Sequence, residues 1–138
     1  MLIARDLMTD APATVTPATT LRRAVEILQT LDIRHLPVVN EDGELIGMLS
    51  DRDLRALSIP YFMGSDCVGS KALDGRVSSI MSGDTLSVDA ETDIAAVVDL
   101  MLENTIGAVP VTGEDGALVG IVSYIDILRN VPLQLAAE

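Results

Sequence analysis

The chain has 138 residues, 49 % of them apolar and 22 % charged, which suffices for one domain with a packed core and argues against disorder. Its formal net charge of −12 lacks the basic footprint of a nucleic-acid-binding protein and disfavours docking on an anionic membrane. A single histidine and a single cysteine exclude an intrachain disulfide, a multi-cysteine zinc site and a histidine-based metal cluster.

The targeting signals are equally sparse. No apolar run approaches the ~18 residues that a membrane-spanning helix needs. The first residues, Met1 to Asp6, turn acidic too early for a secretory signal peptide. We therefore expect a cytoplasmic protein with no membrane partner.

An internal repeat organises the chain. Shifting the sequence by 73 residues aligns Arg5–Leu57 with Ser78–Asn130 without a gap, and fourteen of the 53 aligned pairs are identical. We predict an α/β fold of two repeats, 1–57 and 76–131, with a connecting loop at 58–75 and a tail at 132–138. One repeat alone is too small to bury both faces of its elements, so we expect the two to pack through their sheets about an approximate twofold axis.

Both repeats predict the element order β-α-β-β-α. The expected elements are an extended piece (13–16, 86–89), a helix (19–31, 92–104), two strands (35–39 and 45–49, 108–112 and 118–122) and a short helix (51–57, 124–130). The helices place apolar residues at i, i+3, i+4 and i+7. Asp-Gly at 42–43 and at 115–116 predicts a tight turn between the two strands. In the loop, the apolar run 59–63 predicts packing on the module's own flank or on a second subunit.

The densest motif shared by the repeats is Gly-x-x-Ser-x-x-Asp, at 47–53 and 120–126. A helix start attracts phosphate, the Asp carboxylate accepts ribose hydroxyls, and the Gly allows backbone or ligand to approach closely. The simpler alternative is a capping box, in which Ser and Asp only satisfy the helix start. The residues alone leave both interpretations open.

A second motif places a proline in the first strand of each hairpin, in His35-Leu-Pro37-Val and Ala108-Val-Pro110-Val. Proline has no N–H, which favours a strand edge and leaves neighbouring backbone groups unpaired. A purine edge fits such groups, with Leu36 or Val109 and Val15 or Val88 against its faces. An ordinary edge-strand proline explains the motif equally well.

Arg34 precedes this strand and His35 begins it, and Arg52 and Arg55 follow the other strand. Arg34 and His35 are suited to neutralising phosphate oxygens, although a solvated loop end explains them too. The second repeat has Gly107-Ala108 instead, so two sites cannot be equivalent. Because no pattern pairs a nucleophile with a base, and Cys67 has no reactive context, we expect no enzyme.

Taken together, the doubled β-α-β-β-α unit with its Pro-Val strand and Gly-x-x-Ser-x-x-Asp resembles a stand-alone tandem pair of cystathionine-β-synthase (CBS) domains, a Bateman module. The resemblance covers about Ala4 to Val131. It implies that an adenosyl compound such as AMP, ADP or ATP binds in the cleft between the repeats. It implies no catalytic cofactor, with Mg²⁺ as a companion of the nucleotide.

The resemblance also implies which residues bind. One site would take its ribose contacts from Ser123 and Asp126 and its other contacts from Thr14, Val15, Thr16, Arg34, His35, Leu36 and Pro37. The other site would use Ser50, Asp51, Arg52, Asp53, Ser87, Val88, Val109 and Pro110, with Asp89 beside the adenine wall. Asp89 and the missing basic residue suit this second site to a less anionic ligand.

The leading hypothesis is a regulatory module that senses an adenosyl compound and signals to an unidentified partner by a conformational change. One alternative is a structural or dimerisation pair with no physiological ligand, and another is a binder of S-adenosylmethionine or NAD. The apolar ends around Leu7-Met8, Ile80-Met81, Leu54 and Leu57 predict a homodimer.

Overall fold

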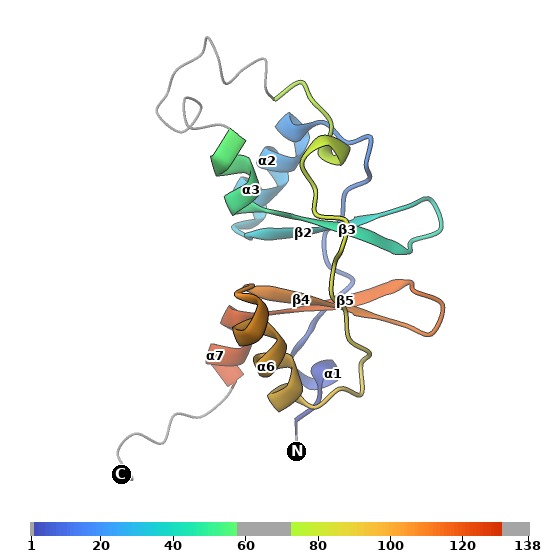
Figure 1. The fold of residues 1–138 in the computed structure, drawn as a ribbon, viewed down its shortest axis with the longest axis vertical. Helices are drawn as coiled ribbons and strands as arrows, with labels where there is room; N and C mark the ends of the chain where they lie inside the picture. The colour runs from blue at the N-terminus through green and yellow to red at the C-terminus, as the bar shows by residue number, and fades with distance from the viewer. Residues whose placement is uncertain (1, 58–72, 131–138) are drawn as a thin grey trace. The chain divides into compact units, whose positions relative to one another are not determined.

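The computed structural model describes residues 2–57 and 73–130, and the chain forms two compact units (Figure 1). Unit 1 consists of Met1–Pro12 and Leu86–Glu138, and unit 2 of Ala13–Thr85. Each unit has its own apolar core. In each, helices cover one face of the strands (Figure 1).

Unit 2 is built from two helices and a hairpin. Its elements are α2 (Leu21–Leu31), β2 (His35–Val39), β3 (Leu45–Ser50), α3 (Asp51–Leu57) and the short 3₁₀ helix η1 (Val77–Ser79). β2 and β3 pair antiparallel, as the Asp-Gly turn predicts. Gly43 within that turn has φ of +81°, a conformation that glycine adopts without steric cost.

Helix α2 follows from its apolar spacing. The four predicted positions Leu21, Ala24, Val25 and Leu28 are all buried in the unit 2 core. Thr20 caps the helix start, since its side chain accepts a hydrogen bond from the N–H of Arg23 at 3.2 Å.

Pro37 lies in β2, an edge strand of the two-stranded sheet, but part of the outer backbone of β2 is paired with Val15. The N–H of Val15 donates to the carbonyl of Pro37 at 3.1 Å, and the N–H of Val39 donates to the carbonyl of Val15 at 2.9 Å. The sequence predicts unpaired backbone groups beside Pro37. For the carbonyl of Pro37 this prediction is wrong, because that carbonyl accepts the hydrogen bond from Val15. A longer parallel pairing would also need a hydrogen bond from the backbone nitrogen of residue 37, and proline has no N–H to donate. This explains why the expected extended piece is reduced to a bridge at Val15.

Unit 1 repeats this plan and adds an N-terminal segment. Its elements are α1 (Ala4–Leu7), β1 (Thr9–Asp10), α6 (Ile94–Asn104), β4 (Ala108–Thr112), β5 (Leu118–Ser123) and α7 (Tyr124–Asn130). The strands lie in the order β1-β5-β4, and Val88 bridges the outer side of β4 as Val15 does in unit 2. Asp93 caps α6 by accepting from the N–H of Ala95 at 3.0 Å. The α/β class is thus confirmed, and each unit shows the expected order α-β-β-α, with the first expected strand reduced to a bridge at Val15 or Val88.

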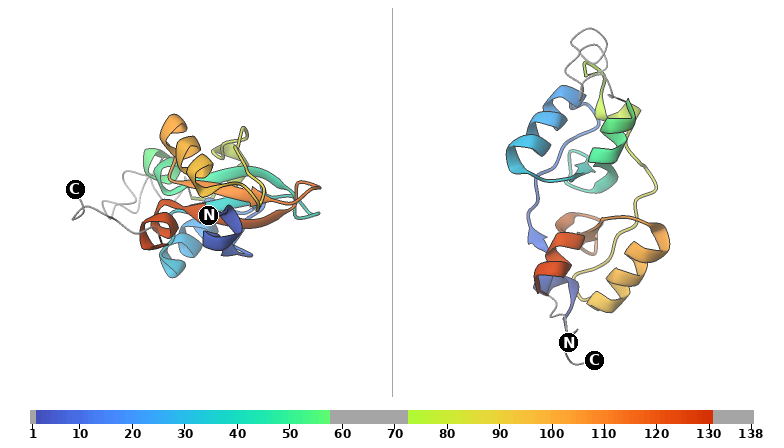
Figure 2. Two further views of the ribbon diagram at one scale, coloured as in Figure 1. Left: turned by 90° about the horizontal axis from the view of Figure 1, so that it is seen from below. Right: turned by 90° about the vertical axis from the view of Figure 1, so that its left-hand side faces the viewer.

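The N-terminal segment, residues 2–12, packs entirely within unit 1. β1 pairs antiparallel with β5 (Figure 2). The N–H of Ala4 donates to the carbonyl of Thr92 at 2.8 Å, and Ala4 and Leu7 are buried in the unit 1 core. The compact units therefore divide the chain after Pro12 and after Thr85, whereas the sequence repeats begin before those points.

Burial corrects one expectation about dimerisation. Leu7 and Leu54 are not exposed apolar ends but core residues, at 7 % and 1 % exposure. Met8, Ile80 and Met81 are partly buried and pack against the two cores. The side chain of Leu57 lies outside the described residues.

Most of the expected connecting loop, including the apolar run 59–63 and Cys67, lies outside the described residues, and so does the expected tail. The last three residues of the connecting loop, 73–75, are described, and they pack on the start of α2. Leu73 is buried, the side chain of Asp74 pairs with Arg22 at 3.1 Å, and the carbonyl of Gly75 accepts from the N–H of Leu21 at 2.9 Å. The end of the loop thus belongs to the unit 2 core.

Candidate functional site

The Ser-x-x-Asp turn has the same geometry in both units. In unit 2 the N–H of Ser50 donates to Oδ2 of Asp53 at 3.0 Å, and the N–H of Asp53 donates to Oγ of Ser50 at 3.2 Å. In unit 1 the corresponding distances between Ser123 and Asp126 are 2.9 and 3.3 Å. These reciprocal bonds form a capping box with aspartate in place of the usual glutamate.

The capping box uses only one oxygen of each carboxylate. Both bonds to Asp126, from the N–H and from Oγ of Ser123, end on Oδ2. Within the described part of the chain, Oδ1 of Asp126 and Oδ1 of Asp53 accept no hydrogen bond. Both side chains are half-buried. Capping therefore leaves each aspartate one oxygen with which to accept a hydroxyl group.

The motif glycines serve packing within the units. A Cβ on Gly47 would lie 2.9 Å from the carbonyl oxygen of Ser82 and 3.0 Å from Sδ of Met81. A Cβ on Gly120 would lie 2.5 Å from Sδ of Met8. Of the two expected reasons for glycine here, the close approach of the protein's own atoms is the one the structure shows.

The expected adenine-wall residues divide into buried and exposed groups. Leu36 and Val109 are fully buried in the two cores, so their side chains have no surface left for a ligand. Pro37, Pro110 and Val15 are buried too, and Val88 is partly buried against the unit 1 core. The exposed candidates are the polar residues that flank the two bridges: Thr14, Thr16, Ser87 and Asp89.

In unit 2 the junction between β3 and α3 is highly charged. Asp51 Oδ2 lies 2.9 Å from Nη2 of Arg55 and 3.5 Å from Nη1 of Arg34. The N–H of Asp51 also donates to the carbonyl of Arg34 at 2.9 Å. Arg34, expected to face a phosphate, is thus already paired with a carboxylate.

His35 lies opposite Ser50 in the hairpin and is half-buried. Burial lowers the pKa of His35 from its usual value of 6.5, because desolvation penalises the charged imidazolium. Asp51 and Asp53 oppose this shift, whereas Arg34 and Arg52 add to it. At neutral pH His35 is therefore suited to a hydrogen bond with a phosphate rather than to neutralising its charge.

The matching junction of unit 1 lacks this charged network. The N–H of Tyr124 donates to the carbonyl of Gly107 at 2.9 Å, which reproduces the backbone bond between Asp51 and Arg34. Uncharged side chains stand where unit 2 has Asp51 and Arg52: Tyr124 and Ile125, which are 41 % and 38 % exposed. Among the described residues, unit 1 therefore has no counterpart of the ion pairs that Asp51 forms with Arg34 and Arg55 in unit 2.

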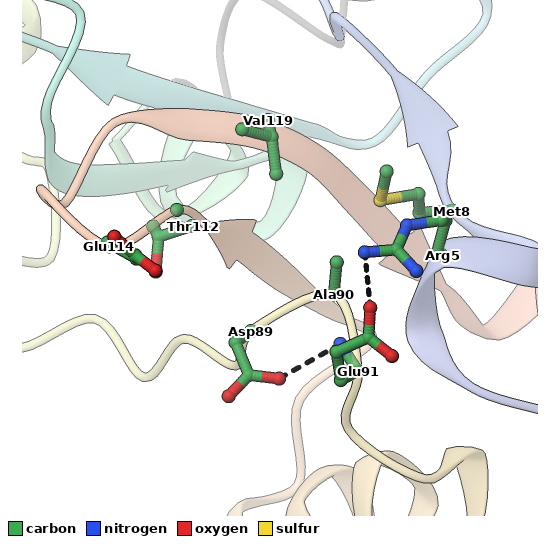
Figure 3. A pocket seen from close by; sticks show the side chains of 9 residues that line it. Arg5, Met8, Asp89, Ala90, Glu91, Thr112, Glu114 and Val119 are labelled. Carbon is green, nitrogen blue, oxygen red and sulfur yellow. Dashed lines mark hydrogen bonds and ion pairs between the residues drawn. The ribbon is translucent and has the colours of Figure 1, made fainter.

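Unit 1 holds an open pocket of about 790 Å³ (Figure 3). The pocket is lined by Arg5, Met8, Asp89, Ala90, Glu91, Thr112, Gly113, Glu114 and Val119. Arg5 forms an ion pair with Glu91, and Oδ1 of Asp89 accepts from the N–H of Glu91 at 2.9 Å. Of these residues, the sequence predicted only Asp89 to lie near a ligand, and Met8 was interpreted as part of an apolar end. The methionine shared by the repeats, Met8, was the signal that the N-terminal segment contributes to this wall.

Two negative observations bear on the site. Among residues 2–57 and 73–130, no three histidine, cysteine, aspartate or glutamate side chains gather as a ligand set for a metal ion. Within the same residues, no helix combines the length and the apolarity needed to cross a bilayer.

Comparison with known proteins decides the family. The family model of the CBS domain matches residues 4–59 and again residues 77–133. The chain belongs to the CBS domain family. A CBS domain-containing protein of Dictyostelium discoideum is 32 % identical over 130 residues, which cover 92 % of this chain and 89 % of that protein.

Two solved structures of CBS proteins are similar to this one. The structure of CBSX2 in complex with AMP is 28 % identical, with a TM-score of 0.79 over 94 % of this chain and 95 % of that one. The CBS domain pair of protein MJ0100, in complex with 5′-methylthioadenosine and S-adenosylmethionine, is 25 % identical, with a TM-score of 0.77 over 94 % of each chain. Both neighbours hold adenosyl compounds.

Proposed function

We propose that this CBS pair is a regulatory module that binds an adenosyl compound and passes its binding state to a partner protein. The observation that carries the proposal is the duplicated Ser-x-x-Asp turn, in which each aspartate keeps one oxygen after capping. A ribose offers hydroxyl groups that such an oxygen can accept. The bound AMP, 5′-methylthioadenosine and S-adenosylmethionine of the two structural neighbours support the same ligand class.

The proposed contacts follow the sequence assignment as modified by the structure. Asp126 and Asp53 accept ribose hydroxyls from their half-buried positions. The exposed side chains beside the two bridges and the backbone of the proline strands contact the base. Unit 1 has Gly107 at the position equivalent to Arg34, so we assign an anionic ligand to the site that uses Arg34. The acidic surroundings of Asp89 in unit 1 suit a less anionic ligand.

We further propose that the module is not an enzyme and acts as a cytoplasmic homodimer. Exposed apolar residues on α7, namely Tyr124, Ile125 and Leu128, support self-association better than the core residues Leu7 and Leu54. Light scattering on the purified chain tests the dimer. The regulated partner is a protein, and Mg²⁺ accompanies a ligand with several phosphates.

Thermal unfolding with added ligand tests the binding function. AMP, ADP, ATP, NAD and S-adenosylmethionine are added in turn, and a ligand present at about 100 times its Kd raises the free energy of unfolding by about 2.7 kcal/mol. With the ligand that stabilises most, Asp126→Ala is expected to weaken binding by about 1.5–3 kcal/mol, the cost of charge-assisted hydrogen bonds.

A matched variant separates ribose binding from capping. Asp93→Ala removes the cap of α6 in the same unit, where Asp93 accepts from the N–H of Ala95 at 3.0 Å. Both variants are expected to lose about 1 kcal/mol of stability. Only Asp126→Ala is expected to lose ligand affinity. Equal affinities in the two variants would show that Asp126 has no role in binding.

The capping box itself favours a second candidate, a structural pair with no physiological ligand. In this case Ser50, Asp53, Ser123 and Asp126 act only as caps. The same melting series decides between the candidates, because a structural pair shows no shift with any of the five compounds.

A further inference from the structure

Asp51 connects two arginines of unit 2 that the binding function does not otherwise link. Its Oδ2 lies 3.5 Å from Arg34 on the loop before β2 and 2.9 Å from Arg55 one turn later in α3. Asp51 is the less exposed partner, with 24 % of its side chain accessible, against 56 % for Arg34 and 60 % for Arg55. The carboxylate therefore lies between two cations that are more exposed to solvent than it is.

The fold does not need this side-chain network. The backbone bond from residue 51 to the carbonyl of residue 34 recurs in unit 1 as the bond from Tyr124 to Gly107, at the same 2.9 Å. Neither residue of the unit 1 pair carries a charge, yet the strand-to-helix junction is the same. The charges of Arg34 and Asp51 are thus free to serve binding.

A phosphate group and the Asp51 carboxylate would bind the same guanidinium. A ligand phosphate that reaches Arg34 displaces Asp51 or lies beside it, and two anions in contact repel each other. The existing ion pair is weak because both partners are partly solvated, so displacement is feasible. Arg55 continues to hold Asp51 when Arg34 turns away.

We propose that Asp51 sets the ligand specificity of the Arg34 site by competing with the ligand's phosphate for the guanidinium. An uncharged adenosyl compound does not meet this competition. Asp51 therefore lowers the affinity for AMP relative to adenosine, and Arg55 moderates the effect by sharing the carboxylate. This inference rests on the proposed binding function.

The test measures the Kd of AMP and of adenosine by calorimetry for wild type and variants. Asp51→Asn is expected to tighten AMP binding by roughly threefold to tenfold and to change adenosine binding much less. In Arg55→Gln, Arg34 is the remaining ion-pair partner of Asp51. Asp51 then competes more strongly with the phosphate for Arg34, so AMP binding is expected to weaken. Asp51→Ser is a second variant that removes the same charge without an asparagine amide, which can form new hydrogen bonds at the start of α3. It is expected to have the same effect as Asp51→Asn on both Kd values.

Two controls make the test specific. Glu26→Gln removes the same single negative charge from unit 2, where Glu26 pairs with Arg23 at 3.1 Å, and it is expected to change neither Kd. In an Arg34→Gln background, Asp51→Asn is expected to change AMP binding no more than Glu26→Gln does.

The outcomes separate the inference from the function on which it rests. If wild type binds neither compound nor any other of the adenosyl panel, the binding function fails and the inference fails with it. If wild type binds but Asp51→Asn tightens AMP and adenosine equally, or acts equally without Arg34, only the inference is overturned.

Discussion

Met8 packs against Gly120, 112 positions later in the chain, so closely that a Cβ on that glycine would lie 2.5 Å from the Met8 sulfur. The pair Met81 and Gly47 repeats this contact in unit 2. Each methionine belongs to the opening segment of one sequence repeat, and each glycine to the hairpin of the other. The opening segments are therefore exchanged between the repeats when the two compact units form.

This contact predicts that Gly120→Ala destabilises unit 1. The added methyl group would meet Met8 at 2.5–2.9 Å and the carbonyl oxygen of Thr9 at 3.0 Å, and backbone cannot move aside cheaply. Overpacking of this kind costs about 1–3 kcal/mol, visible as a lower melting temperature. Gly113→Ala is the control, because its nearest neighbours would be at 3.8 Å and stability should hardly change. Equal losses in both variants would contradict the close packing.

The N-terminal segment is expected to contribute to the unit 1 core. Leu7→Ala removes a side chain that is 7 % exposed within that core, and we expect a loss of about 2–3 kcal/mol. Leu102→Ala, at 73 % exposure on α6 of the same unit, should cost far less. Chemical denaturation measures both, and a harmless Leu7→Ala would mean that the segment is only loosely attached.

Thr105 ends α6 in a strained conformation, with φ of +53°. A β-branched residue is disfavoured there, whereas asparagine adopts the left-handed region more readily. Thr105→Asn is therefore expected to raise the free energy of unfolding by up to about 1 kcal/mol, part of the roughly 1–2 kcal/mol that the left-handed region costs an ordinary L-residue. Asp32, in the same position after α2 with the same φ, provides the comparison, since aspartate already tolerates this region and Asp32→Asn should gain little.

His35 predicts a dependence of stability on pH. Because burial lowers its pKa below 6.5 in the folded state, the unfolded chain binds the proton more readily. The contribution of His35 is complete above pH 6.5 and is lost as the pH falls through the folded-state pKa. Asp51 and Asp53 limit the shift, and Arg34 and Arg52 extend it. Melting from pH 8 down to 5 should show a smaller decline in His35→Gln than in wild type.

Much of the fold was predictable because its signals are local. Apolar spacing predicted α2 and α6, and the Asp-Gly turns predicted both hairpins within a residue of their observed bounds. The duplicated Ser-x-x-Asp turn was equally local, because its hydrogen bonds span three residues. The expected twofold relation between the repeats stays a prediction.

The sequence predicted which residues lie near the candidate site, but not which of their side chains are exposed or already paired. Leu36 and Val109 were predicted as ligand contacts because each lies next to the proline of its strand. Side chains alternate between the two faces of a strand, and those of Leu36 and Val109 point into the two cores. The ion pair of Arg34 with Asp51 joins residues 17 positions apart that carry no pairing signal. Whether a charged side chain is paired depends on which strand ends meet, and no local pattern records that.

The sequence by itself determined the repeat, the element order and the residues of the Ser-x-x-Asp turn, since periodicity, capping and turn chemistry act over a few residues. Only the tertiary structure decided that residues 2–12 complete the core of unit 1. It also decided which carboxylate holds Arg34. The reason is physical: burial and charge pairing depend on distances in space, and segments far apart in the chain set those distances.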